Sequence, residues 1–162
     1  MAVRAAKYPP LGRRSFGPLR ASRYGAALGD YMAAPDHRTA LIVQIEDARA
    51  AREIEQILNV PGIDGVFMGP NDLALSLLKP GETLRGDASQ WSAFARTPEV
   101  LRLCTDVLQA CRSAEMPFGM TTANGEDARQ WLDRGSKFVT LGSDVTFLRA
   151  GARSMQAVGV GA

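Results

Sequence analysis

The chain has 162 residues, of which 46% are hydrophobic and 22% are charged, and its formal net charge is +2. This length allows one domain with a buried core, and the composition excludes disordered and fibrous proteins. The small net charge gives no support for a nucleic-acid surface, and no apolar run approaches the roughly 20 residues of a membrane span. We therefore expect a globular protein that binds neither nucleic acid nor membrane.

Residues 1–39 contain no convincing strand. Tyr8-Pro9-Pro10 and Gly12 are typical of a loop, and 19–34 is predicted to be a short helix. Six basic residues and no acidic residue occupy the first 25 positions. They form either an arm for an anionic partner or a solvated stretch that once packed on an acidic surface.

From residue 40 onward, a short apolar run is followed by a helical pattern four times. The first run, ALIVQI, is nearly continuous, which is typical of a strand covered on both faces in a parallel sheet. The predicted strands are 40–45, 65–69, 117–122 and 137–142. The predicted helices are 47–58, 98–114, 125–134 and a last one that begins at Ser143 or Asp144.

Several helix ends carry local signals. Thr97, Pro98 and Glu99 fit the N-cap, first position and first-turn acid of one helix. Asn124 can cap the next helix, and Gly135 can end it. The stretch between the second strand and Thr97 is predicted to be a helical turn plus a long loop, and such loops are often functional.

This alternation predicts an α/β fold with parallel strands and right-handed crossovers. Four β/α units over 40–155 form either half of a (β/α)8 barrel or a small open sheet, and periodicity alone does not choose between them. Residues 1–39 would precede these units as a remnant, and 156–162 would be a frayed tail.

Cys104 and Cys111 lie seven residues apart on one face of a predicted helix. They are poorly placed for a mutual disulfide, and free cysteines are often small core residues. The N-terminus also lacks the apolar segment of a secretory signal. We expect two reduced, buried thiols and a cytoplasmic protein.

Polar side chains gather where the first two predicted strands end. Gln44 and Glu46 are two residues apart, so they share one face, and Asp72 follows the second strand. In parallel α/β folds these strand ends line the ligand site. Two carboxylates without nearby Cys or His favour an oxygen-preferring divalent ion. The alternative is that Glu46 and Asp72 only cap the helices that follow them.

Between these carboxylates lies the turn Gly69-Pro70-Asn71. Proline holds this backbone rigid, and the amides after it open a helix, which makes a natural nest for a carboxylate. Gly-Pro is also a common turn, so the motif alone is weak.

The segments LIVQIEDARAAREIEQILNVPGIDGVFMGPNDLALSL and PFGMTTANGEDARQWLDRGSKFVTLGSDVTFLRAGAR resemble the HpcH/HpaI aldolase family. The early stretch KYPPLGRRSFGP resembles the family's segment before its fifth strand. The resemblance implies the C-terminal half of a (β/α)8 barrel, strands five to eight with their helices, and a cytoplasmic class II aldolase. Such an enzyme forms or cleaves 2-oxo acids through a metal-bound pyruvate enolate.

By the same resemblance, Glu46 and Asp72 bind a divalent metal, either Mg²⁺, Mn²⁺ or Co²⁺. Gln44 is implied as a catalytic and substrate-binding residue, and Gly69, Pro70 and Asn71 are implied to receive the pyruvate carboxylate. The partners would be pyruvate, or a related 2-oxo acid, and an aldehyde. No Schiff-base lysine is required.

The chain departs from this family at its N-terminal side. Strands one to four have no counterpart, nor do the family's proton-transferring histidine and substrate-clamping arginine. His37, the sole histidine, does not match that histidine and is expected in a surface loop. Arg13 and Arg14 do not match the arginine by motif, although their loop could border the site.

Three interpretations of a chain that resembles only the C-terminal half of the barrel remain open. The chain is a piece of a longer enzyme, it rebuilds a barrel as a homo-oligomer or with another chain, or it is a smaller degenerate domain. Three functions remain open too: an aldolase, a non-catalytic half-barrel module, and a related citrate-lyase-type enzyme that binds a coenzyme A thioester. No segment specifically indicates a coenzyme A site.

Overall fold

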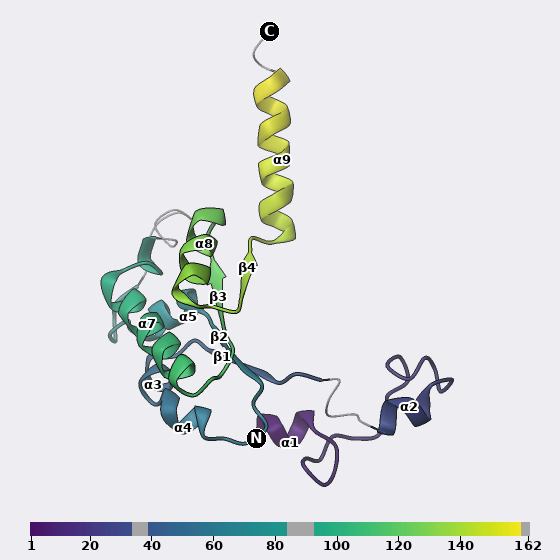
Figure 1. Ribbon diagram of the computed structural model, residues 1–162. Coiled ribbons are helices and arrows are strands. Elements are labelled where there is room, and N and C mark those ends of the chain that lie inside the picture. The colour runs from purple at the N-terminus through teal and green to yellow at the C-terminus, as the bar shows by residue number, and fades with distance from the viewer. Residues whose placement is uncertain (34–38, 84–92, 160–162) are drawn as a thin grey trace.

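The computed structural model describes residues 1–33, 39–83 and 93–159. These residues form an α/β structure around a four-stranded sheet with the order β1-β2-β3-β4 (Figure 1). All three neighbouring pairs are parallel, as predicted. The strands are β1 (Ile42–Ile45), β2 (Gly65–Met68), β3 (Phe118–Thr122) and β4 (Phe138–Leu141).

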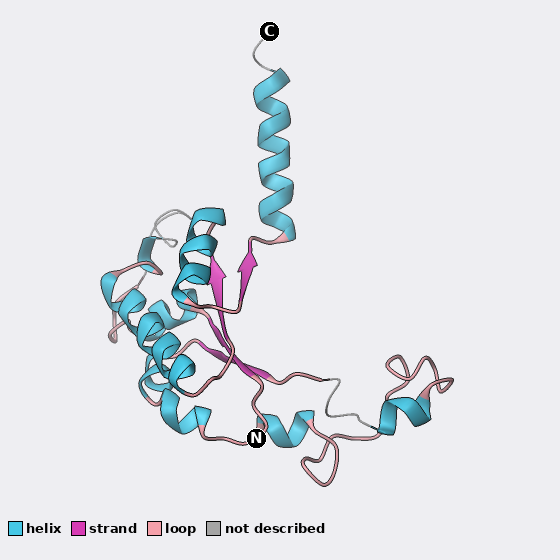
Figure 2. Ribbon diagram, viewed as in Figure 1, coloured by secondary structure: helices cyan, strands magenta, loops and turns pink. Residues whose placement is uncertain are grey.

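The helices that follow the first three strands cover one face of this sheet (Figure 2). The long helix α7 lies along this layer and contacts α3, α4, α5 and β3. The described helices are α1 (Ala2–Ala6), α2 (Leu28–Ala33), α3 (Ala48–Arg52), α4 (Ile54–Leu58), α5 (Pro70–Ser76), α7 (Pro98–Ser113), α8 (Gly125–Arg134) and α9 (Asp144–Gly159). None of these helices is long and apolar enough to cross a bilayer.

The core lies between the sheet and this helical layer. Alternate strand residues point into it, so that Val66 and Met68 of β2 and Phe118 and Met120 of β3 are at most 1% exposed. Trp131 of α8 packs against Phe118, with ring centroids 6.3 Å apart. Several buried residues of α7 complete the cluster: Val100, Leu103, Cys104, Val107, Leu108 and Cys111.

Both cysteines are free and buried, as predicted. Burial raises the pKa of the Cys104 thiol to about 12 and that of the Cys111 thiol to about 11. The apolar surroundings disfavour the charged thiolate, so both side chains act as small core residues.

Among the described elements, no helix covers the opposite face of the sheet (Figure 1). Ile42 of β1 points to this face and is 46% exposed. Phe67 and Phe138 stack here with ring centroids 5.8 Å apart, across the intervening strand β3. Gly119 makes this possible, because a Cβ at that position would lie 2.1 Å from the Phe138 ring. The open face is therefore partly apolar.

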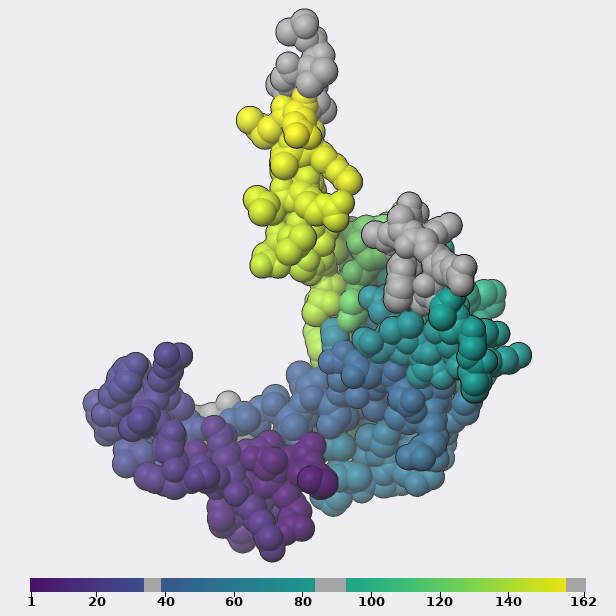
Figure 3. Space-filling view, turned by 180° about the vertical axis from the view of Figure 1, so that it is seen from behind, coloured from purple at the N-terminus to yellow at the C-terminus, as the bar shows by residue number. Residues whose placement is uncertain are grey.

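The N-terminal segment is joined to the sheet by a lysine. The side chain of Lys7 is 6% exposed, and its Nζ donates to the Thr39 carbonyl at 3.1 Å and to Asp64 Oδ2 at 3.2 Å. Thr39 and Asp64 precede β1 and β2, so this contact lies at the amino edge of the sheet. Beyond it, the rest of the N-terminal segment projects from the body, as does α9 (Figure 3).

Local signals located the middle elements well. Asn124 caps α8 by accepting a hydrogen bond from the Asp127 amide at 2.9 Å, and Gly135 ends this helix with a φ of 113°. Pro98 opens α7 as predicted, although the Thr97 side chain makes no capping bond.

Other predicted boundaries were wrong. The helix expected over 47–58 is divided at Glu53, which leaves the helical region with a ψ of 19°, and both halves keep apolar residues buried. The helix expected over 19–34 is confined to α2, because Arg23, Tyr24 and Gly25 have positive φ angles that no α-helix allows. Helix α1 was not predicted.

Candidate metal and substrate site

The candidate residues lie at the carboxyl edge of β1 and β2. Ile45 and Met68 are register partners at the ends of these strands, and the Gly69 amide donates to the Ile45 carbonyl at 2.9 Å. Glu46 and Gly69 are therefore neighbours, each one residue beyond its strand. This edge is where parallel α/β folds place their ligands.

Three of the predicted residues are in contact here. Gln44 Nε2 donates a hydrogen bond to Glu46 Oε2 at 2.8 Å. This pair lies over Gly69, since a Cβ built there would be 2.9 Å from Gln44 Nε2 and 3.3 Å from Glu46 Oε2. Any side chain at position 69 would displace the amide or the carboxylate. The glycine thus keeps the space that this pair occupies.

Asp47, and not Glu46, caps the helix that follows β1. Asp47 Oδ1 accepts from the Arg49 amide at 2.9 Å and from the Ala50 amide at 3.2 Å. The capping alternative is therefore wrong for Glu46. Its carboxylate is exposed and available for another ligand.

The second carboxylate, Asp72, lies in the first turn of α5. Pro70 is buried at the first helical position, whereas Asn71 and Asp72 are exposed. The backbone ladder of this helix begins with the Leu73 amide donating to the Gly69 carbonyl at 3.1 Å. The preceding amides of Asn71 and Asp72 stand ahead of that ladder. The helix dipole also favours an acid at this position. For Asp72, stabilisation of the start of α5 therefore remains an alternative to metal binding.

The donor atoms fit a hard divalent cation. Glu46 and Asp72 offer carboxylate oxygens, which Mg²⁺ and Mn²⁺ prefer. Across the described ranges no three His, Cys, Asp or Glu side chains are grouped closely enough to form a metal cluster. A cation bound to these two carboxylates would take its other ligands from other oxygens, such as those of water or substrate.

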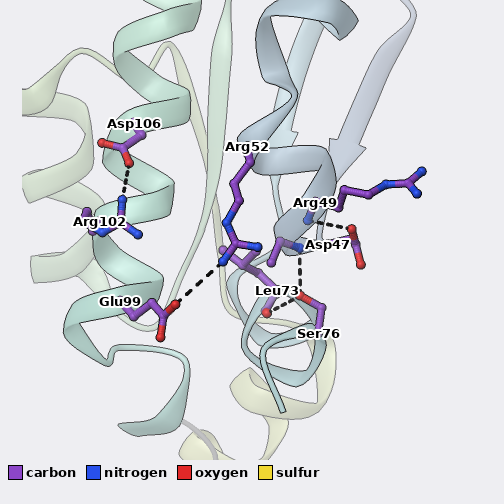
Figure 4. Close-up of polar contacts among 9 residues, drawn as sticks. Asp47, Arg49, Arg52, Leu73, Ser76, Glu99, Arg102 and Asp106 are labelled. Atoms are coloured by element: carbon purple, nitrogen blue, oxygen red, sulfur yellow. Dashed lines mark hydrogen bonds and ion pairs between the residues drawn. The ribbon is translucent and has the colours of Figure 1, made fainter. Parts of the chain in front are cut away.

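Ser76, which sequence reasoning did not identify, links the segment that follows Glu46 to the helix that carries Asp72 (Figure 4). Its hydroxyl accepts a hydrogen bond from the Ala48 amide at 2.9 Å and donates to the Leu73 carbonyl at 2.7 Å. Ala48 opens α3, whereas Leu73 and Ser76 belong to α5. A serine late in a helix is common, so the sequence offered no specific signal for this contact.

Arg96 was also missed. It forms an ion pair with Asp127, whose Oδ2 also accepts from the Ala123 amide at 2.8 Å. This pair ties the segment before α7 to the first turn of α8, just beyond the carboxyl end of β3. It is a partly buried arginine at the same edge as the candidate site, although it is already paired.

The lysines and Arg14 lie elsewhere. Lys7 and Lys137 are at the amino edge, ahead of the strands, and Lys79 follows α5 in an exposed turn. The Arg14 guanidinium carbon lies 4.8 Å from the centroid of the Tyr8 ring, and its backbone amide donates to the Lys7 carbonyl. The Arg14 loop thus packs at the amino edge and does not border the carboxyl-edge site. His37 lies outside the described residues.

A hollow of about 440 Å³ opens at the amino edge, between the carboxyl ends of α7 and α8. Among its lining residues, Arg112 donates from Nη1 to the Arg134 carbonyl at 3.3 Å. The Arg112 side chain thus stabilises the carboxyl end of α8. None of the candidate residues lines this hollow.

Comparison with known proteins assigns these motifs to a family. The sequence model of the HpcH/HpaI aldolase/citrate lyase family matches residues 1–150. A 4-hydroxy-2-oxo-heptane-1,7-dioate aldolase from Klebsiella pneumoniae is 36% identical over 159 residues, which is 97% of this chain and 55% of that protein.

Solved structures agree with this match. A HpcH/HpaI aldolase/citrate lyase family protein from Burkholderia cenocepacia superposes with a TM-score of 0.79 and 33% identity, over 96% of this chain and 58% of that chain. A HpcH/HpaI aldolase from Desulfitobacterium hafniense, at 24% identity and a TM-score of 0.75 over 98% and 57% of the two chains, shares the fold. The chain spans about half the length of the relatives it matches.

Proposed function

The chain belongs to the HpcH/HpaI aldolase/citrate lyase family, and from this premise we propose that it carries the metal-binding part of a 2-oxo acid aldolase. The reaction class is carbon–carbon lyase, with pyruvate as the enolate-forming half and an aldehyde as the other half. The observation that carries the proposal is the contact of Gln44 with Glu46 over Gly69, the residue that precedes the helix carrying Asp72 in its first turn.

Each residue has a distinct part in this proposal. Glu46 and Asp72 would hold a divalent cation, which supplies Lewis-acid polarisation of the 2-oxo group when bound. Gln44 orients the Glu46 carboxylate by donating to one of its oxygens. The amides of Asn71 and Asp72, which precede the backbone ladder of α5, are suited to donate hydrogen bonds to the substrate carboxylate, and Gly69 and Pro70 set their direction.

The positions of Lys7 and Lys137 favour a metal-dependent mechanism over one in which either of them forms a Schiff base. The Lys7 ammonium is engaged by Thr39 and Asp64 at the amino edge, and Lys137 precedes β4 at that edge as well. A nucleophilic lysine would have to reach the carboxyl edge, where the candidate residues lie.

The test is exchange of the pyruvate C3 protons in deuterated water with Mg²⁺, Mn²⁺ or Co²⁺, followed by NMR. We expect exchange by the unaltered chain, and its loss in Asp72→Asn and Glu46→Gln. Asp133→Asn, an exposed acid near the end of α8, is the matched control and should leave the rate unchanged. Undiminished exchange in Asp72→Asn would refute the assignment of that residue.

We further propose that β1–β4 correspond to strands five to eight of a (β/α)8 barrel, with residues 1–39 as the segment before it. Four parallel strands in sequential order, with helices on one face, support this proposal. The exposed Ile42 and the stacked Phe67 and Phe138 would then face the barrel interior. Strands one to four would cover them and pair with the free edges of β1 and β4.

That geometry favours a second candidate function, a half-barrel that is inactive until another polypeptide completes it. The partner would be a chain that carries the N-terminal half, or a further copy of this chain. Helix α9 also supports association, because its apolar side chains Val145, Phe147, Leu148 and Met155 are 58–76% exposed. Light scattering gives the mass of the assembly. Retained Mn²⁺ binding without C3 exchange, and activity restored by the N-terminal half of a relative, would support this candidate.

A further inference from the structure

Ser76 holds together the two segments that carry Glu46 and Asp72. Its Oγ donates to the carbonyl of Leu73, the residue directly after Asp72, and accepts from the amide of Ala48, two residues after Glu46. One hydroxyl therefore links segments 28 residues apart in the chain. Figure 4 shows this contact between the two short helices.

The Ala48 amide has a specific need for this acceptor. In the first turn of α3, the Arg49 and Ala50 amides donate to Asp47 Oδ1, and the Ala51 amide donates to the Asp47 carbonyl. Ala48 is the remaining donor of that turn, and its residue is 4% exposed. A buried amide without a partner is strongly disfavoured, so the Ser76 hydroxyl completes the helix start.

The Ser76 hydroxyl bridge is a more directional contact to α3 than the ion pair that the helix makes with α7. Helix α3 also carries Arg52, whose Nη2 lies 3.9 Å from Glu99 Oε1 of α7. That pair is exposed and contributes little. The hydroxyl bridge is therefore the directional contact that relates the start of α3 to α5.

From these contacts we infer that Ser76 is a positioning residue for the candidate metal centre, setting the separation of the Glu46 and Asp72 carboxylates. The inference rests on the proposed function. Ser76 touches neither the cation nor the substrate, and it acts through the backbone on either side. Groups that hydrogen-bond directly to metal ligands change affinity about 10- to 100-fold when removed, and we expect a group that acts through the backbone to lie at the lower end of this range.

The test compares Ser76→Ala, Ser76→Thr and Thr105→Ala in the full chain, with Mn²⁺ as the probe. Thr105 is a matched control, because its hydroxyl donates to the Leu101 carbonyl at 2.8 Å within α7 and lies in neither segment of the site. Free Mn²⁺ is measured by electron paramagnetic resonance. The exchange rate of the Ala48 amide is measured by NMR without metal.

We expect Ser76→Ala to weaken Mn²⁺ binding about tenfold and to accelerate exchange of the Ala48 amide. Ser76→Thr keeps a hydroxyl and should restore both readouts, and Thr105→Ala should change neither. Equal losses of Mn²⁺ affinity in Ser76→Ala and Thr105→Ala would mean a general loss of stability and would overturn the inference.

Failure of the inference and failure of the proposed function give different results. If the unaltered chain binds Mn²⁺, Asp72→Asn abolishes binding and Ser76→Ala binds normally, the inference is wrong and the proposed metal centre stands. If the unaltered chain binds no Mn²⁺, the proposed metal centre is wrong, and the positioning role is overturned with it.

Discussion

The amide of Gln44 donates to the carboxylate of Glu46 at 2.8 Å, and these two exposed residues flank the buried Ile45 at the end of β1. Residues two apart share one face of a strand, so these two long side chains lie within reach of each other. The contact engages Glu46 Oε2 and limits the directions in which the carboxylate can point.

Removing this donor is expected to weaken metal binding. In Gln44→Leu the Glu46 carboxylate loses its orienting hydrogen bond, so we predict an affinity for Mn²⁺ lower by about tenfold, measured by calorimetry. Gln56→Leu makes the same change on the exposed side of α4 and serves as the control. Equal affinities of the Gln44→Leu and Gln56→Leu chains would contradict the prediction.

Gly119→Ala is expected to destabilise the fold. The new Cβ would lie 2.1 Å from the Phe138 ring, which would have to leave its stack with Phe67. Overpacking of this kind costs about 1–3 kcal/mol, and urea unfolding would measure it. Gly151→Ala in α9 is the control, because that position has open space around it and alanine favours a helix. A Gly119→Ala chain as stable as the unaltered one would show that the ring moves freely.

Asp64 is expected to make stability depend on acid pH. The Leu41 amide, which donates to Asp64 Oδ2 at 2.6 Å, lowers the pKa of this carboxyl, and the Lys7 ammonium adds to the effect. Because the folded pKa is below the unfolded one, the stabilisation is present above the unfolded value of about 3.9 and is lost as the pH falls through the folded value.

We therefore predict that the unfolding free energy of the unaltered chain falls more steeply below about pH 4 than that of Asp64→Asn. Urea titrations from about pH 6 to about pH 3 would measure both. Asp106→Asn, in an exposed pair with Arg102 on α7, is the control. Parallel pH profiles for the unaltered and Asp64→Asn chains would contradict the role of Asp64.

The two cysteines are expected to resist thiol reagents in the folded chain. With pKa values of about 12 for Cys104 and about 11 for Cys111, almost no reactive thiolate exists at neutral pH, and burial blocks access. Labelling with a chromogenic disulfide should therefore be slow in buffer and should reach both thiols quickly in urea. Rapid labelling without denaturant would show that the core opens at α7.

Short-range features of this protein were readable from sequence. The apolar runs located β1 to β4, although the structure covers only one face of the sheet with helices and leaves Ile42 and Leu141 exposed on the strands at its two edges. Asn124 and Gly135 marked the ends of α8, because a cap acts on the backbone within a few residues of itself. The motif residues Gln44, Glu46 and Gly69 were identified together, and the chain indeed brings them into contact.

The tertiary structure decided what depends on distant partners. Asp47 caps α3, and Glu46 does not, because the backbone directs the Asp47 carboxylate toward the first amides of the helix. Two adjacent acids look alike in sequence, so the sequence alone does not show which of them is the cap. The Ser76–Ala48 contact spans 28 residues and the Lys7–Asp64 pair spans 57, so both require the chain path around the sheet. Periodicity and caps describe only the nearest neighbours along the chain, whereas these hydrogen bonds form between segments that folding brings together.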